Sequence, residues 1–120
     1  MSNYPKAIGP YSVYREANGF LYISGQLPIN PNSGEIEAKD IKGQTKQALL
    51  NIRAILKENK LSFQNVIKST CFLADINDFV AFNEIYAEFF ASPYPARSAF
   101  AVKDLPKKAL VEIEIIAYKG

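Results

Sequence analysis

The segment from Leu110 to Tyr118, which reads LVEIEIIAY, decides the fold that the sequence predicts. Successive side chains of a strand point to opposite faces, so this segment presents two different rows. One row is wholly apolar and suits a covering layer of helices: Val111, Ile113, Ile115 and Ala117. The other row is too apolar for plain solvent exposure and too acidic for a dry core: Leu110, Glu112, Glu114, Ile116 and Tyr118.

Two segments have the periodicity of amphipathic helices that could cover the apolar row. The first begins at Asp40, a plausible N-cap, and repeats apolar or small side chains at helical spacing: Ile41, Thr45, Ala48, Leu49, Ile52, Ile55 and Leu56. The second is predicted to be capped by Asn77 or Asp78 and to end before Pro93 and Pro95. Its apolar side comprises Phe79, Phe82, Ile85, Tyr86, Phe89 and Phe90. Two helices can cover one face of a sheet, so we expect the other face to meet another subunit.

Further strands are predicted on both sides of these helices. Residues 20–25 (FLYISG) follow Asn18-Gly19, a dipeptide typical of tight hairpins, and the partner strand is expected around 11–15. Residues 26–34 have the proline and asparagine content of a loop. Two more strands are expected at 66–73 and 97–102. The prediction is a single α+β domain over 1–120 with the order β-β-α-β-α-β-β, a mixed sheet and both helices on one face.

Composition limits the classes of function. The chain has 120 residues, 48% of them hydrophobic and 22% charged, which fits one globular domain. The formal net charge of +2 lacks the concentrated positive charge of a dedicated nucleic-acid binder. No apolar run approaches the about 18 residues of a membrane span, and the first residues lack the apolar stretch of a signal peptide. We therefore expect a cytoplasmic protein with a small-molecule or protein partner.

The absence of histidine is the sharpest exclusion. Without imidazole the chain cannot form a Ser-His-Asp triad, a Cys-His dyad or a histidine-containing zinc site. The single cysteine, Cys71, offers no metal or redox pair, and its place in a strand pattern is typical of a small buried side chain. Any catalysis must rest on carboxylates, Arg, Lys, Tyr, Ser or the backbone.

Arg97 is the most informative single position. It follows the rigid segment 92–96 (SPYPA) at the start of a predicted strand, where a guanidinium can be aimed rather than left free in water. Arginine is well shaped to hold a carboxylate through two parallel hydrogen bonds. The alternative is an ordinary arginine at a strand end that is solvated or paired with Glu114.

Separated motifs along the chain resemble the RidA/YjgF family of reactive-intermediate deaminases. Residues 95–100 (PARSAF), followed by Leu105-Pro106 and 111–113 (VEI), are similar to its C-terminal signature. The other matching segments are 7–12 (AIGPYS), 24–28 (SGQLP) and 75–79 (DINDF), the last leading into Asn83 and Tyr86. The resemblance covers nearly the whole chain. It implies a chorismate-mutase-like fold, a homotrimer with three clefts between subunits, a central last strand, and a crossover over 103–109 in place of a hairpin.

The resemblance also implies roles for individual residues. Arg97 matches the arginine that holds the ligand carboxylate, and Glu112 matches the glutamate that positions or activates the attacking water. The residues that match other parts of the family's cleft are Tyr11, Ser24, Gly25, Phe82, Asn83 and Ala99. Many members have cysteine where this chain has Ala99, so any dependence on a thiol at that position is excluded here.

The implied reaction is hydrolysis of 2-aminoacrylate-type enamines or their 2-imino acid tautomers to 2-keto acids and ammonia, a 2-iminobutanoate/2-iminopropanoate deaminase activity. It needs neither metal nor cofactor, because an iminium carbon is already electrophilic and requires mainly orientation and proton transfer. The family further implies that pyridoxal-phosphate enzymes acting on serine or threonine supply the substrate. No nucleic-acid or membrane partner is expected.

Two other functions remain open at this stage. The same clefts could belong to a non-catalytic regulatory module that binds small carboxylates or keto acids through Arg97. Ribonuclease activity, also attached to this family, is the least favoured, because the chain lacks histidine and a basic stripe interleaved with exposed aromatics.

Overall fold

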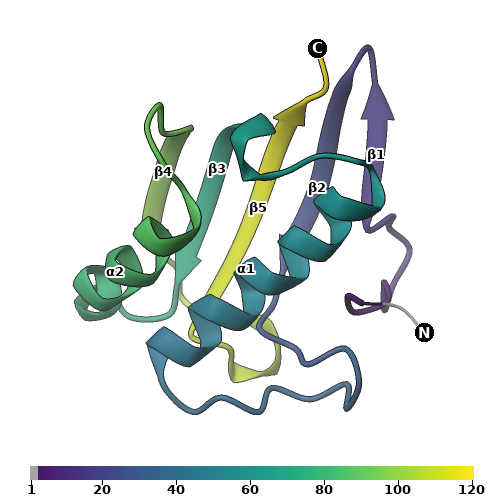
Figure 1. Ribbon diagram of the computed structural model, residues 1–120. Coiled ribbons are helices and arrows are strands. Elements are labelled where there is room, and N and C mark those ends of the chain that lie inside the picture. The colour runs from purple at the N-terminus through teal and green to yellow at the C-terminus, as the bar shows by residue number, and fades with distance from the viewer. Residues whose placement is uncertain (1–2) are drawn as a thin grey trace.

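Five strands form one mixed sheet with both helices on the same face (Figure 1). The computed structural model describes residues 3–120. The strands are β1 (Tyr14–Ala17), β2 (Phe20–Gln26), β3 (Val66–Leu73), β4 (Ala96–Ala101) and β5 (Val111–Tyr118), and the helices are α1 (Ile41–Glu58) and α2 (Phe79–Phe89). The sheet order is β1-β2-β5-β3-β4, in which only β3 and β4 are parallel. This architecture confirms the predicted α+β class and element order.

Strand β5 lies in the middle of the sheet, as the family resemblance implied. It pairs with β2 on one side and with β3 on the other, so the chain after β4 crosses over past β3 instead of forming a hairpin. The apolar row is buried beneath the helices: Val111, Ile113, Ile115 and Ala117. The mixed row of Glu112, Glu114, Ile116 and Tyr118 occupies the uncovered face, and Leu110 lies just before the strand.

The β1–β2 hairpin turns at Asn18 and Gly19, whose φ angles of 51° and 84° are both positive. Asparagine and glycine tolerate this left-handed backbone, which explains the two-residue turn. Strand β1 begins at Tyr14, three residues later than expected, because its ladder with β2 starts at the Tyr14–Ile23 pair. Tyr11 therefore lies in the segment that precedes the strand.

Helix α1 follows the predicted pattern closely. The Asp40 side chain accepts a hydrogen bond from the Gly43 backbone N–H at 2.9 Å and so caps the first turn. Every apolar or small position predicted for this helix is buried against the sheet. Burial of this stripe, with the apolar row of β5, forms the core.

The start of α2 differs from the prediction. Neither Asn77 nor Asp78 caps the helix with its side chain. The chain instead enters through a 3₁₀ turn over Ile76–Asp78, in which the Asp75 side chain accepts from the Asn77 N–H at 2.9 Å. Because this turn runs directly into the α-helix, Asp78 already has a right-handed helical backbone and cannot act as a conventional cap.

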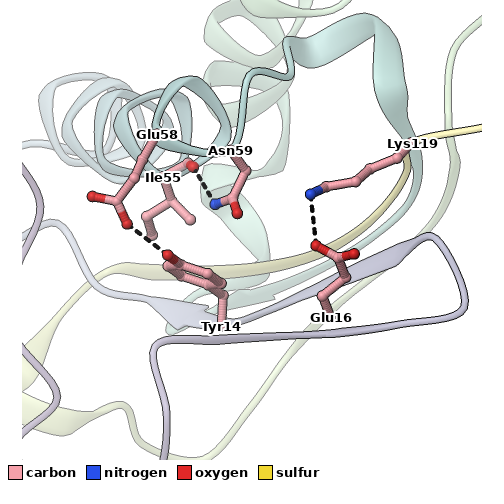
Figure 2. A network of polar contacts seen from close by, with 6 residues as sticks. All are labelled: Tyr14, Glu16, Ile55, Glu58, Asn59 and Lys119. Atoms are coloured by element: carbon pink, nitrogen blue, oxygen red, sulfur yellow. Dashed lines mark hydrogen bonds and ion pairs between the residues drawn. The ribbon is translucent and has the colours of Figure 1, made fainter.

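A polar network ties the edge strand β1 to the rest of the fold (Figure 2). The hydroxyls of Tyr14 and Tyr4 both donate to the same oxygen of Glu58, at 2.7 and 2.8 Å. These bonds lower the pKa of Glu58, and burial together with the Glu58 contact raises the pKa of Tyr4 to about 12. The Lys119 ammonium donates to Glu16 at 2.6 Å nearby.

None of the helices within 3–120 is long and apolar enough to span a bilayer.

Candidate active site

Arg97 lies on the edge strand β4, on the face that the helices cover. Its register partner on β3 is Ser69, which is fully buried on that face. Helix α2 presents one side to the arginine, with contacting side chains spread over about two turns from Phe79 to Tyr86. The start of β4 thus fixes the position of the Arg97 backbone, and contacts with α2 fix the orientation of its side chain.

The guanidinium of Arg97 is held by aromatic rings and one amide. Its central carbon lies 4.8 Å from the ring centroid of Tyr86, 5.4 Å from that of Phe79 and 5.8 Å from that of Phe82. Its Nη1 donates to Oδ1 of Asn83 at 2.8 Å. Cation–π contacts of this kind favour a charged group that keeps its N–H edge free for hydrogen bonds.

A cavity of about 360 Å³ opens beside this guanidinium. It is lined by Asn83, Tyr86, Ala87, Tyr94, Pro95 and Arg97. Phe82 is fully buried and lies behind the guanidinium instead of lining the cavity. An exposed arginine that is already oriented at the wall of a cavity can bind a small carboxylate with little loss of side-chain conformational entropy.

Glu112 lies on the other face of the sheet, beside a bulge in β2. Between Ile23 and Gln26 the β2 strand contains two residues, Ser24 and Gly25, where β5 has only Glu114. The bulge keeps Gln26 pointing inward after Ile23, and it places Gly25 directly against Glu112. A Cβ atom at Gly25 would approach Oε2 of Glu112 to 2.4 Å, so glycine leaves the space that this carboxylate occupies.

The environment of Glu112 favours the neutral form of its carboxyl group. Partial burial raises its pKa, and the charge of Glu114 on the same face raises it further. A carboxyl group with a raised pKa is better suited to exchange protons near neutral pH than an ordinary surface glutamate.

Tyr11 and Ser24 lie near Gly25, the residue that faces Glu112. Tyr11 is half exposed and shares a small hollow with Gly25 and residues of the N-terminal segment. The Ser24 hydroxyl donates to the Ser12 carbonyl at 2.7 Å, and the Ser24 N–H donates to the Val13 carbonyl at 2.9 Å. These two bonds fasten the segment that carries Tyr11 to β2.

The predicted residues therefore form two groups on opposite faces of the sheet. The side chains of Arg97, Ser69 and Ile115 belong to one row on the helix-covered face. Phe100, Phe72 and Glu112 form a row on the uncovered face. One chain alone does not bring Arg97 and Glu112 to a common cavity.

The position that often carries cysteine in the family holds Ala99, two residues beyond Arg97 on β4 and half buried against the core. Its register partner is Cys71 on β3. Cys71 is fully buried, and burial raises the pKa of its thiol to about 11, so the thiol is protonated and unreactive at neutral pH. This confirms the expectation of a small buried side chain at Cys71.

Sequence reasoning placed Tyr86 on the apolar side of α2 but did not assign it to the site. Its ring is the nearest aromatic group to the Arg97 guanidinium, and its hydroxyl is 2.7 Å from that of Ser69. The available signal was spacing, because Asn83 and Tyr86 are three residues apart and share a helix face.

Comparison with known proteins shows which family this chain belongs to. The family model described as "Endoribonuclease L-PSP" matches residues 1–119. A RutC family protein of Pyrococcus horikoshii is 55% identical over 117 residues, covering 98% of this chain and 93% of that protein. The human 2-iminobutanoate/2-iminopropanoate deaminase is 47% identical over 116 residues, covering 97% of this chain and 85% of that protein.

A solved structure is similarly close. The crystal structure of Escherichia coli TdcF with bound serine superposes with a TM-score of 0.94 at 40% identity, covering 100% of this chain and 96% of that chain. Taken with the match of the family model over nearly every residue, these likenesses show that this chain belongs to the RidA/YjgF family, also described as Endoribonuclease L-PSP.

Proposed function

We propose that this protein hydrolyses 2-imino acids, and the 2-aminoacrylate-type enamines that tautomerise to them, to 2-keto acids and ammonia. The observation that carries the proposal is the preset guanidinium of Arg97, held by Asn83 and the α2 rings at the wall of a cavity. The names of relatives support the substrate class, since the human relative is a 2-iminobutanoate/2-iminopropanoate deaminase and the TdcF structure holds serine, itself a small amino acid with a carboxylate.

Arg97 would hold the substrate carboxylate through its free N–H edge. This contact fixes the C=N carbon relative to a water molecule. The attack of water then becomes effectively unimolecular, because both reactants are oriented within the cleft. Ala99 would contribute its backbone beside the arginine. Tyr11 and Ser24 with Gly25 would form the opposing wall.

Glu112 would activate the water. As the water oxygen bonds to the carbon of the protonated imine, the C=N electron pair moves to the nitrogen and Glu112 accepts one proton of the water, so the resulting carbinolamine carries a hydroxyl and a neutral amino group. Glu112 then returns that proton to the amino nitrogen, the C–N bond breaks as the C=O bond forms, and the hydroxyl proton passes to the departing ammonia, which leaves as ammonium. One carboxyl group with a raised pKa can serve in both transfers.

The placement of the two groups on opposite sheet faces requires a second copy of the chain. We propose a homotrimer in which Arg97 of one subunit and Glu112 of the next line the same cleft. The uncovered face supports such an assembly, because it exposes large apolar side chains in addition to Glu112: Tyr22, Ile67, Phe100 and Tyr118. Several large exposed apolar side chains on one sheet face are typical of a surface that is covered in the assembled protein.

The test is release of keto acid from an imine generated in situ. A pyridoxal-phosphate dehydratase acting on threonine or serine supplies 2-iminobutanoate or 2-iminopropanoate, and keto acid is followed with wild type, with Arg97→Ala and without protein. The proposal expects acceleration by wild type alone. Equal rates in all three samples, with folded wild-type protein, would refute the deaminase.

The same samples separate the other candidate functions. A regulatory module would bind 2-oxobutanoate in an Arg97-dependent manner without accelerating imine hydrolysis. For a ribonuclease, the expected result would be RNA cleavage that persists in Arg97→Ala. Cleavage is disfavoured by Glu112 and Glu114, two adjacent acidic side chains on the uncovered face that would repel phosphates.

A further inference from the structure

Arg97 touches one aromatic side chain that is itself anchored to the sheet. Tyr86 has its ring centroid 4.8 Å from the guanidinium carbon, nearer than Phe79 or Phe82. Its hydroxyl is 2.7 Å from the hydroxyl of Ser69. Tyr86 is 5% exposed and Ser69 is fully buried, so this hydrogen bond is shielded from water.

The anchor and the arginine are neighbours in the sheet. Ser69 on β3 is the register partner of Arg97 on β4. A single tyrosine thus contacts Arg97 with its ring and the residue beside Arg97 with its hydroxyl. The two contacts fix the height and the rotation of the ring above the sheet, and the ring in turn limits where the guanidinium can lie.

We infer that Tyr86 and Ser69 are a positioning pair that holds the Arg97 guanidinium in its carboxylate-binding orientation. The inference rests on the proposed function, because it assigns these residues to the binding of the substrate carboxylate. Neither residue performs chemistry: the Tyr86 hydroxyl is occupied by Ser69, and burial raises the pKa of Tyr86 and keeps that hydroxyl protonated.

The buried hydrogen bond separates positioning from stability. Tyr86→Phe leaves the Ser69 hydroxyl buried with only a 4.0 Å contact from the Cys71 thiol, and Ser69→Ala leaves the Tyr86 hydroxyl without its hydrogen-bond partner. Each single variant should therefore lose thermal stability. The double variant Ser69→Ala/Tyr86→Phe removes both polar groups and should recover much of the loss. The hydrogen bond that anchors the residue 86 ring to β3 is absent in all three variants.

The experiment measures stability, ligand binding and the order of the Arg97 side chain in wild type and these three variants. The probe ligand is 2-oxobutanoate, a stable 2-keto acid. The order of the Arg97 Nε–H bond is followed by nuclear magnetic resonance relaxation without any ligand, with Arg97→Lys used to assign the signal. We expect the dissociation constant and the KM for 2-iminobutanoate to rise about fivefold in all three variants, which is the effect of one lost hydrogen bond, while kcat changes less than about twofold.

The double variant gives the decisive comparison. The inference expects it to regain the thermal midpoint but to keep weak binding and a disordered Arg97 Nε–H bond. If its binding returns with its stability, the pair is merely structural and the inference is wrong. The matched control is Tyr14→Phe on β1, the edge strand opposite β4, which removes a hydroxyl bonded at 2.7 Å to Glu58 of α1 (Figure 2). It should leave KM and Arg97 order unchanged.

Failure of the inference can be told from failure of the proposed function. Wild type that accelerates imine hydrolysis, with variants that bind and order Arg97 as wild type does, keeps the deaminase and refutes the positioning pair. Wild type without acceleration refutes the deaminase, and the relaxation of the Arg97 Nε–H bond still decides whether Tyr86 and Ser69 position it.

Discussion

The surroundings of Arg97 and of Glu112 differ in how far one chain completes them. Arg97 has an amide acceptor, three aromatic rings and a cavity, all supplied by its own chain. Glu112 has glycine on one side and a second carboxylate, Glu114, on the same face, and its pKa is raised. The comparison teaches that one chain completes the surroundings of Arg97, the proposed carboxylate-binding half, whereas it leaves Glu112, the proposed proton-transferring half, open on the uncovered face of the sheet.

The largest expected effect on activity comes from replacing Arg97, the residue proposed to bind the substrate carboxylate. Arg97→Ala should lower kcat/KM about a thousandfold, because two charge-assisted hydrogen bonds to the substrate carboxylate are lost. Arg97→Lys should recover only part of this, since an ammonium cannot form the two-pronged contact. Steady-state kinetics with imine generated in situ measures both, and size-exclusion chromatography controls for assembly. Near-normal kcat/KM in Arg97→Ala would refute the proposal that Arg97 binds the substrate carboxylate.

The next largest effect on activity comes from replacing Glu112, the residue proposed to transfer protons. Glu112→Gln should lower kcat about a hundredfold while binding of 2-oxobutanoate changes little, because proton transfer is lost and Arg97 is untouched. The wild-type rate should fall at acid pH through a pKa above the ordinary 4.5, since the carboxylate acts as base only above its raised pKa. A pH–rate profile that has no such limb, or one that is identical in Glu112→Gln, would argue against this role.

A smaller effect should follow from crowding Glu112. In Gly25→Ala the new Cβ would meet Oε2 of Glu112 at 2.4 Å, and the flexible end of the glutamate can swing away at little cost to the fold. We expect kcat to fall about tenfold with the thermal midpoint nearly unchanged. Gly34→Ala is a useful contrast, because no atom lies within 4 Å of its added Cβ, although its φ of 75° strains alanine. That variant should lose stability and keep kcat, the reverse of Gly25→Ala.

The smallest effect should come from a region outside both halves. Glu58 is exposed and accepts from Tyr4 and Tyr14, and these bonds lower its pKa. A carboxyl group with a lowered pKa in the folded state adds stability above its unfolded pKa and loses it as the pH falls through the folded value. Glu58→Gln should therefore have a slightly lower thermal midpoint at neutral pH, a difference that shrinks as the pH falls below the ordinary 4.5 and disappears once the pH is below the lowered pKa of the folded state. Activity should be unchanged, and a large loss would place this network in the site.

The patterns that sequence analysis read correctly are those set by periodicity. The alternation of β5 predicted which side chains α1 and α2 bury, and the spacing after Asp40 predicted α1 together with its cap. The cap of α2 was predicted wrongly, because a 3₁₀ turn capped by Asp75 precedes the helix and local propensity does not show how two turns join.

The candidate site was only partly accessible from sequence. Motif resemblance pointed to Arg97 and Glu112, but the register that puts them on opposite faces depends on the order of strands in the sheet, and patterning alone did not choose that order. The bulge at Ser24 and Gly25 has the same origin, since an extra residue is visible only once the pairing with β5 is known. Tyr86 escaped assignment because a buried tyrosine on an apolar helix side is typical of a core residue.

The central claim is that Arg97 of one subunit works with Glu112 of another, and mixing inactive variants tests it most directly. Arg97→Ala and Glu112→Gln are unfolded together in equal amounts and refolded, and keto-acid release is compared with that of each variant refolded alone. Random mixing in a trimer gives about one cleft in four with both native residues, so the account predicts recovery of about a quarter of wild-type activity. Mixed trimers, verified by mass spectrometry, that remain as inactive as the separate variants would contradict the claim.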